Sequence, residues 1–255
     1  MSRHTAWMTI RSEEDLDGIR RVGRVVADTL FTMRKAVTPG ISTRELDDIG
    51  AEVMRVAGAG SAPQLVYGFP AVNLISVNDE VVHGIPGPRR IGPGDVVKLD
   101  VTAELNGYIA DAAETVVVPP VSAIAARMQM CSVDAFRKGM RAARVGRPVR
   151  AIGAAVERKV RDCGFHVLRE LSGHGVGRTI HEPPTIPNYD APFAVQRLRD
   201  GMVITIEPLI SMSLTDSFTA PDGWTIRTRD GSLAAHHEHT IIVWNHGPEI
   251  VTRIA

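Results

Sequence analysis

Two aspartates stand in opposite arms of a predicted β-hairpin. Residues 96–118 contain β-rich runs on either side of Asn106-Gly107, and this dipeptide between such runs is the strongest short signal for a two-residue hairpin turn. The turn sets a register that pairs Leu105 with Tyr108, Thr102 with Asp111, and Asp100 with Ala113. Asp100 and Asp111 then lie on the same face of the hairpin as diagonal neighbours.

Two carboxylates on one strand face repel each other unless a cation or a shared proton lies between them. Aspartate is depleted in strands, and Asp100 and Asp111 each stand among apolar residues, in the sequences KLDVT and YIADAA. A solvated strand face would not need such surroundings. The pair therefore favours a divalent metal ion, and a carboxylate dyad that shares one proton is the alternative.

Three further candidate ligands lie in the second half of the chain. His174 stands between glycines in SGHGVGRTIHEPP, Glu207 ends the apolar run MVITIEP, and Glu238 lies in HHEHTIIVW. With the two aspartates they make four carboxylates and one imidazole. This donor set suits hard or borderline ions such as Mn, Fe, Co or Zn, and two ions about 3.5–4 Å apart could share carboxylates.

The histidines around Glu238 are predicted to have other roles. Strand alternation sends His237 and His239 to the face opposite Glu238. His236 would share the face of Glu238, and for it we expect a structural or solvent-facing role instead of ligation.

The elements that must position these residues recur along the chain. Residues 12–37 and 42–57 have apolar stripes at helical spacing behind serine caps, and the same order returns in residues 122–145 and before Gly164. Equivalent positions are 106 residues apart, and Asp100 overlies Glu207 at an offset of 107. An internal duplication predicts an α+β fold in which halves 12–118 and 122–255 form one catalytic domain, residues 1–255.

The composition excludes several classes of protein. The chain has 29 basic and 29 acidic residues, with a pI near 7.1, and this balance argues against binding to nucleic acid. Prolines interrupt the longest uncharged stretch, 56–78, so no membrane span is expected. Two cysteines and the lack of a secretory signal before Arg11 are typical of a cytoplasmic protein.

Six motifs resemble type I methionine aminopeptidase in order and spacing, namely VHGIP, LDV, IADAAET, SGHGVGRTIHEP, ITIEP and EHTI. The resemblance covers nearly the whole chain. It implies the pita-bread fold, in which two pseudo-symmetric helix-helix-strand halves with antiparallel sheet surround a central dinuclear metal site. Carried over position by position, it implies that Asp100 ligates one ion, that Asp111 and Glu238 bridge both, and that His174 and Glu207 complete the other.

The resemblance also implies an activity: hydrolytic removal of the N-terminal methionine from nascent proteins and peptides with a small second residue. A bridging hydroxide activated by two ions of Co, Mn, Fe or Zn would attack the peptide carbonyl. Glu207 could carry the proton to the leaving amine. His83 in VHGIP and His181 in IHEP match the two active-site histidines of the family that are not ligands, and they would position the peptide and stabilise its oxyanion.

The pocket for the first side chain is where this sequence departs from the family, which usually has more aromatic and cysteine residues there. The expected lining comprises Phe69, Trp224, Val66, Leu74 and Ile180. This apolar slot suits an unbranched thioether. With less aromatic bulk, selectivity could relax toward leucine or phenylalanine.

Two other functions are alternatives to the methionine-specific one. A proline-specific relative on the same fold, such as an Xaa-Pro aminopeptidase or prolidase, usually carries a separate N-terminal domain, and we expect none because the first helix starts near Ser12 and the chain ends at Ala255. A binding protein without catalysis would be expected to lose ligands. The expected partners are peptide N-termini, and a monomer suffices. The metal and any association with the ribosome stay open.

Overall fold

The computed structural model describes residues 8–253. The predictions for the extreme N-terminus therefore lie partly outside the described residues. The helices are α1 (Glu13–Ala36), α2 (Thr43–Val56), α3 (Ala62–Tyr67), α4 (Ala123–Ala142) and α5 (Arg150–Asp162). The strands up to the middle of the chain are β1 (Gly60–Ser61), β2 (Leu74–Val77), β3 (Glu80–Val82), β4 (Val96–Leu105), β5 (Tyr108–Val117), β6 (His166–Val167) and β7 (Ser172–Gly175). The remaining strands are β8 (Glu182–Pro187), β9 (Met202–Ile206), β10 (Leu209–Ser211), β11 (Ser217–Thr219), β12 (Ile226–Thr228), β13 (Ala234–His236), β14 (Glu238–Val243) and β15 (Glu249–Ile250).

The four long helices confirm the periodicity seen in the sequence, and their starts follow local capping chemistry. The Ser12 side chain accepts the Asp15 N–H at the start of α1, and Ser122 caps α4 in the same way. Ser42 forms a full capping box with Glu45 at the start of α2. Such caps satisfy backbone donors that a helix start leaves free. The short helix α3 was not predicted.

The β4–β5 hairpin has the register that its turn predicts. Asn106 and Gly107 have φ values of 53° and 79°, the left-handed pair that a type I′ turn requires. The observed partners are Leu105 with Tyr108, Thr102 with Asp111, and Asp100 with Ala113. The two aspartates therefore do share one face of the hairpin.

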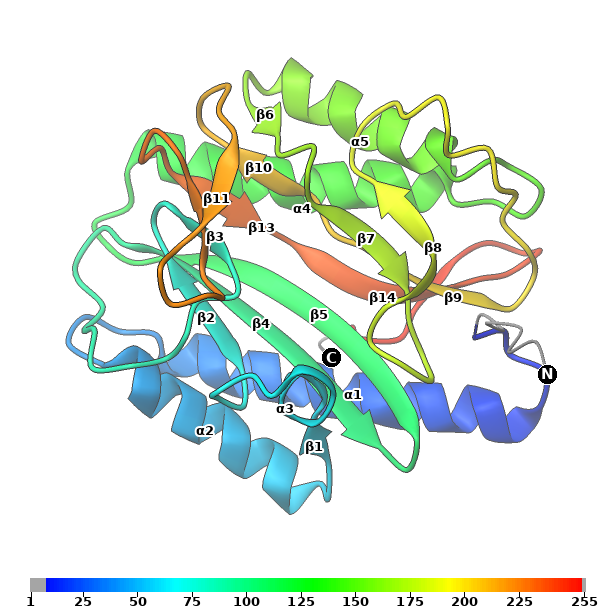
Figure 1. Ribbon diagram of the computed structural model, residues 1–255, viewed down its shortest axis with the longest axis horizontal. Helices are drawn as coiled ribbons and strands as arrows, with labels where there is room; N and C mark the ends of the chain where they lie inside the picture. Colours follow the sequence, from blue (N-terminus) through cyan, green and yellow to red (C-terminus); the bar gives the residue numbers. More distant parts are fainter. Residues whose placement is uncertain (1–7, 254–255) are drawn as a thin grey trace.

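Antiparallel pairing joins the two parts of the chain in one large sheet, ordered β1-β4-β5-β14-β9-β7-β8 with β2 on β4 and β15 on β14. Its centre is the contact of β5 with β14, where Glu238 pairs with Ala113. Helices α1 and α2 pack on the β4–β5 side, and α4 and α5 pack near β9 and β8 (Figure 1). The two buried apolar clusters lie under these two helix pairs.

Two glycines allow close backbone contacts, one between a helix and the chain beneath it and one between two strands. At Gly153 in α5, a Cβ atom would lie 2.1 Å from the carbonyl oxygen of Tyr189. At Gly173 in β7, next to the candidate ligand His174, a Cβ atom would lie 2.7 Å from the Thr205 carbonyl oxygen. Both distances are shorter than any van der Waals contact, so only glycine permits these approaches. The glycines around His174 thus let β7 lie tightly against β9.

Candidate metal centre

The sheet register brings the candidate ligands to one face. Ala113 of β5 pairs with Asp100 on one side and with Glu238 on the other. Directly paired residues point to the same side of a sheet, and so do residues two positions apart, which adds Asp111. Three neighbouring strands therefore direct three carboxylates into one hollow.

The second half of the chain completes this cluster. His239 pairs with Ile206, so Glu238 and Glu207 stand next to each other at the end of β9. The His174 Nε2 atom lies 3.4 Å from Glu207 Oε1. Ligand atoms of Asp111, His174 and Glu238 all lie within 4.8 Å of one another. The structure therefore brings together the five residues that the sequence suggested as ligands.

Without bound metal, burial of these side chains makes their ionised forms unfavourable in free energy. Asp100, Asp111, His174 and Glu238 are all buried, and the Glu207 side chain is only 12% exposed. Burial raises the pKa of Asp111 to about 7 and, together with the charge of Asp111, raises the pKa of Glu207 to about 8. Burial and the neighbouring carboxylates raise the pKa values of Asp100 and Glu238 as well.

A divalent cation fits this donor set. The Glu238 Oε1 atom is buried and has no hydrogen-bond partner, although buried polar atoms are nearly always paired. Bound metal would both neutralise the carboxylates and occupy their unused lone pairs. Converging oxygen and nitrogen donors with one unsatisfied carboxylate oxygen are what such a site requires.

Three threonines orient the candidate ligands. Thr102 Oγ1 donates to Asp111 Oδ1 at 2.9 Å, and Thr205 Oγ1 donates to Glu207 Oε1 at 2.9 Å. Thr240 accepts the Asp111 N–H. Hydrogen bonds from neighbouring residues commonly fix metal ligands in this way. Sequence reasoning missed the threonines, although Thr205 stands two positions before Glu207 and thus on the same strand face.

His174 is oriented by its own loop. Its Nδ1 atom lies 2.9 Å from the carbonyl oxygen of Gly175, which assigns the proton to Nδ1 and leaves the lone pair on Nε2. Burial, with the nearby His181, lowers the pKa of His174 to about 3. The ring is therefore neutral and able to ligate a cation through Nε2.

His83 and His181 lie across the same pocket, whose lining includes both side chains. Burial lowers the pKa of His83 to about 4, with a further contribution from His181. The His181 ring centroid is 4.3 Å from that of His174. The hydroxyl of Tyr67 lies 2.5 Å from His181 Nδ1. Tyr67 at the end of α3 is a functional candidate that the sequence did not reveal.

The apolar end of the pocket contains four of the five residues expected there. Phe69, Leu74, Ile180 and Trp224 all line it. The rings of Phe69 and Trp224 pack edge to face, with their centroids 5.2 Å apart. Val66 does not line the pocket. Pro63 and Tyr67, four positions apart on one side of α3, both line the site, and Val66 does not lie on that side of the helix. Replacing Val66 by Tyr67 corrects the predicted lining.

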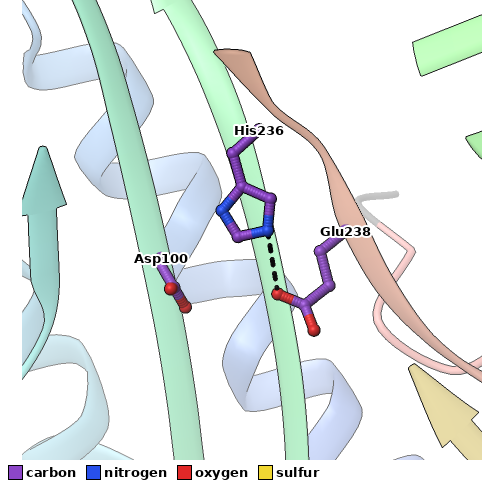
Figure 2. A group of neighbouring side chains, drawn as sticks. All are labelled: Asp100, His236 and Glu238. Atoms are coloured by element: carbon purple, nitrogen blue, oxygen red, sulfur yellow. Dashed lines mark ion pairs between the residues drawn. The ribbon is translucent and has the colours of Figure 1, made fainter. Parts of the chain in front are cut away.

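The histidines around Glu238 behave only partly as expected. The ring centroids of His237 and His239 lie 5.4 and 5.0 Å from that of Phe136 in α4. Both rings are thus on the helix side of the sheet, as alternation predicts. His236 is not solvent-facing: its side chain is 1% exposed and Nε2 lies 3.5 Å from Glu238 Oε2 (Figure 2). Of the two roles expected for His236, the solvent-facing one is therefore excluded, because β3 and β10 cover this end of β13, which strand alternation does not reveal.

Within residues 8–253, no helix combines the length and apolarity needed to cross a membrane. The sequence model of metallopeptidase family M24 matches residues 17–245. Methionine aminopeptidase 2 of Bacillus subtilis (strain 168) is 40% identical over 249 residues, which are 97% of this chain and 100% of that protein. Methionine aminopeptidase of Clostridium perfringens is 39% identical and covers 96% of this chain and 98% of its own length.

The fold is also similar to that of solved structures. The crystal structure of methionine aminopeptidase from Thermotoga maritima superimposes with a TM-score of 0.93 at 32% identity, covering 96% of this chain and 99% of that one. A prolidase from Pyrococcus furiosus superimposes with a TM-score of 0.77 at 23% identity, covering 96% of this chain and 66% of that one. The second likeness concerns the fold alone.

Proposed function

Because this chain belongs to metallopeptidase family M24, which the family match and the 40% identical relative show, we propose that it removes the N-terminal methionine from peptides and nascent proteins whose second residue is small. It has the pita-bread fold expected from the sequence, and the likeness to solved structures of methionine aminopeptidases confirms this. The observation that supports the activity most strongly is the buried cluster of carboxylates and imidazole beside an apolar pocket.

The family uses divalent metal, and we propose two ions of Co, Mn, Fe or Zn in this chain. The proposed ligands are the five clustered side chains, Asp100, Asp111, His174, Glu207 and Glu238. When bound, the ions would supply positive charge that makes a water molecule acidic enough to act as a nucleophile near neutral pH. The remaining steps fall to protein side chains.

Glu207 would take a proton from the attacking water and deliver it to the leaving amine. Its position at the end of β9 exposes one edge of the carboxylate to the pocket, and Thr205 fixes the other through Oε1. A general base must lie within hydrogen-bond reach of the proton that it takes, and Glu207 lines the pocket in which water and peptide would meet. The carboxylate is thus suited to hold the proton between the two transfers.

His83 and His181 would donate hydrogen bonds to the substrate peptide. Both rings line the pocket, and burial lowers both pKa values, so each ring is neutral and presents one N–H. A donor aimed at the developing oxyanion stabilises the transition state more than the ground state. The four apolar residues at the other end of the pocket, Phe69, Leu74, Ile180 and Trp224, would receive the methionine side chain.

We further propose that the chain acts as one catalytic domain, because residues from both of its halves line a single pocket. A reducing compartment such as the cytoplasm agrees with two free thiols, Cys131 and Cys163. The proposed partners are the N-termini of peptides and nascent chains. The proposed oligomeric state is a monomer. No ribosome contact is assigned.

The peptide Met-Ala-Ser tests the proposed function. Metal-stripped protein is expected to leave it intact, and added Co, Mn, Fe or Zn should restore release of free methionine, measured by chromatography of the products. Parallel peptides should begin with Leu-Ala or Ala-Pro. Cleavage of an Xaa-Pro peptide with Met-Ala-Ser left intact would instead favour a prolidase-like function, and preferred cleavage of the Leu peptide would show relaxed selectivity.

Tyr67→Phe is expected to lower kcat/KM for Met-Ala-Ser by about tenfold, the size typical of losing one orienting hydrogen bond. The phenol is the partner of His181 Nδ1, and without it the ring can adopt the tautomer whose Nε2 carries no proton. Steady-state kinetics measure the change. Leu65→Ala, on the exposed side of the same short helix, is the matched control and should leave kcat/KM within about twofold. Equal effects of the two variants would contradict the role of the hydroxyl.

A further inference from the structure

His236 is a buried histidine whose ring lacks a partner. Its side chain is 1% exposed, and neither Nδ1 nor Nε2 forms a hydrogen bond with any described residue. A neutral imidazole carries one N–H and one lone pair, and burying both without partners is costly. Native proteins rarely leave such a group unsatisfied. The ring therefore needs a partner that the protein itself does not supply.

The position of this ring is fixed by the backbone. The His236 N–H donates to Thr115 Oγ1 at 2.9 Å, and Thr115 Oγ1 donates to the His236 carbonyl oxygen at 2.7 Å. On its other side, His236 pairs with Leu209 of β10. Figure 2 shows the ring between Asp100 and Glu238, with the nearer nitrogen directed at the Glu238 carboxylate.

The distance between His236 and Glu238 fits shared coordination better than a hydrogen bond. Nε2 lies 3.5 Å from Glu238 Oε2, beyond the roughly 2.7–3.2 Å of an N–H···O bond. Two donors that bind one tetrahedral ion at about 2.0–2.2 Å lie about 3.4 Å from each other. Ligand atoms of Asp100, His236 and Glu238 all lie within 4.8 Å of one another.

We propose that His236 is a metal ligand on the Asp100 side of the centre. The centre then has two similar donor sets, Asp100 with His236 and Asp111 with His174, and Glu238 belongs to both. This inference rests on the proposed two-metal function and adds a sixth ligand to the five of the family resemblance. A second imidazole would shift the preference of that site from Mn toward Co, Zn or Fe(II), since nitrogen donors suit borderline ions.

Cobalt titration of the metal-stripped protein tests the assignment. Calorimetry should find two bound Co²⁺ ions per wild-type chain, and His236→Ala should weaken one of them by about tenfold or more while the other keeps its affinity. The visible absorption of the cobalt protein should change in band position and intensity with the loss of one nitrogen donor. His237→Ala is the matched control: the neighbouring ring faces Phe136, and both cobalt affinities should stay as in the wild type.

His236→Gln separates ligation from a hydrogen bond to Glu238, because the amide keeps a donor but lacks the imidazole. It should show the same weakened cobalt site and altered spectrum as His236→Ala. Wild-type affinities and spectrum in either variant would overturn the assignment. These measurements need no peptide, so failure of the inference is distinct from failure of the function, which wild-type inactivity toward Met-Ala-Ser would reveal.

Discussion

Glu207→Gln is expected to lower kcat for Met-Ala-Ser by about 10³-fold or more, in the upper part of the range for loss of a general acid–base residue. The amide is isosteric and can still accept the Thr205 hydrogen bond. It carries no charge and cannot move a proton between water and the leaving amine. The substitution also removes one proposed ligand, so one cation should bind more weakly. Stopped assays with enough enzyme to detect single turnovers measure the change.

Glu114→Gln is the matched control for this prediction. Glu114 is also a poorly exposed carboxylate, and burial raises its pKa to about 7. It lies on β5 on the face opposite the pocket and pairs with Arg34 of α1 at 3.5 Å. Its substitution should change kcat less than about twofold. If Glu207→Gln kept most of the wild-type kcat, the proton-transfer role of Glu207 would be wrong.

Removing the metal should make the stability of the protein strongly dependent on pH between about 5 and 8. In this range the unfolded chain has ionised carboxylates. The folded, metal-free chain keeps protons on Asp111 and Glu207, because burial raises their pKa values to about 7 and about 8. The contribution of such a carboxyl group to stability is complete below its unfolded pKa of about 4, falls as the pH rises toward its folded pKa, and is constant above that value. The free energy of unfolding should therefore fall as the pH rises.

The loss amounts to about 1.4 kcal/mol per pH unit for each proton that only the folded state retains. Bound metal favours the ionised carboxylates, so stabilisation by Mn²⁺ or Co²⁺ should grow with pH across this range. Burial lowers the pKa of Lys98 to about 7, so this group makes the free energy of unfolding rise with pH above that value. It does so in the metal-bound and in the metal-free protein alike. The quantity to measure is thus the difference between urea unfolding curves with metal and with chelator.

Asp111→Asn provides the control for the pH effect, because it removes one of the protons concerned while keeping the side-chain volume. The metal-free variant should lose less stability between pH 5 and 8 than the metal-free wild type. A metal-dependent stabilisation that did not change with pH would contradict a cluster of buried, repelling carboxylates.

The parts of the site that follow from local chemistry could be predicted from the sequence. The Asn106-Gly107 turn defines the register of its own hairpin, so the shared face of Asp100 and Asp111 was predictable from residues in between. Helix starts at Ser12, Ser42 and Ser122 depend on contacts within one turn. Bringing His174 and Glu207 to the same hollow required the family resemblance, because no local pattern shows that β9 pairs with β14 and with β7.

The failures share a different cause, which is that exposure depends on distant segments. Val66 and Tyr67 are adjacent, and either could face the pocket by composition. The turn of α3, set by the Ser61 cap and by Gly68 at its end, decides in favour of Tyr67. His236 was placed on the correct strand face, but whether that face meets water or protein depends on β10, a segment more than twenty residues earlier in the chain.

The two-residue turn of the β4–β5 hairpin limits how this chain can change in evolution. Surface turns usually tolerate insertions well, and Asn106 and Gly107 are exposed. One added residue there would shift the pairing by one position and send every side chain of one arm to the other face. Asp111 would then point toward α1, and Ala110 or Ala112 would take its place in the hollow. Lineages of this protein should therefore vary in length at other loops and conserve the length of this turn.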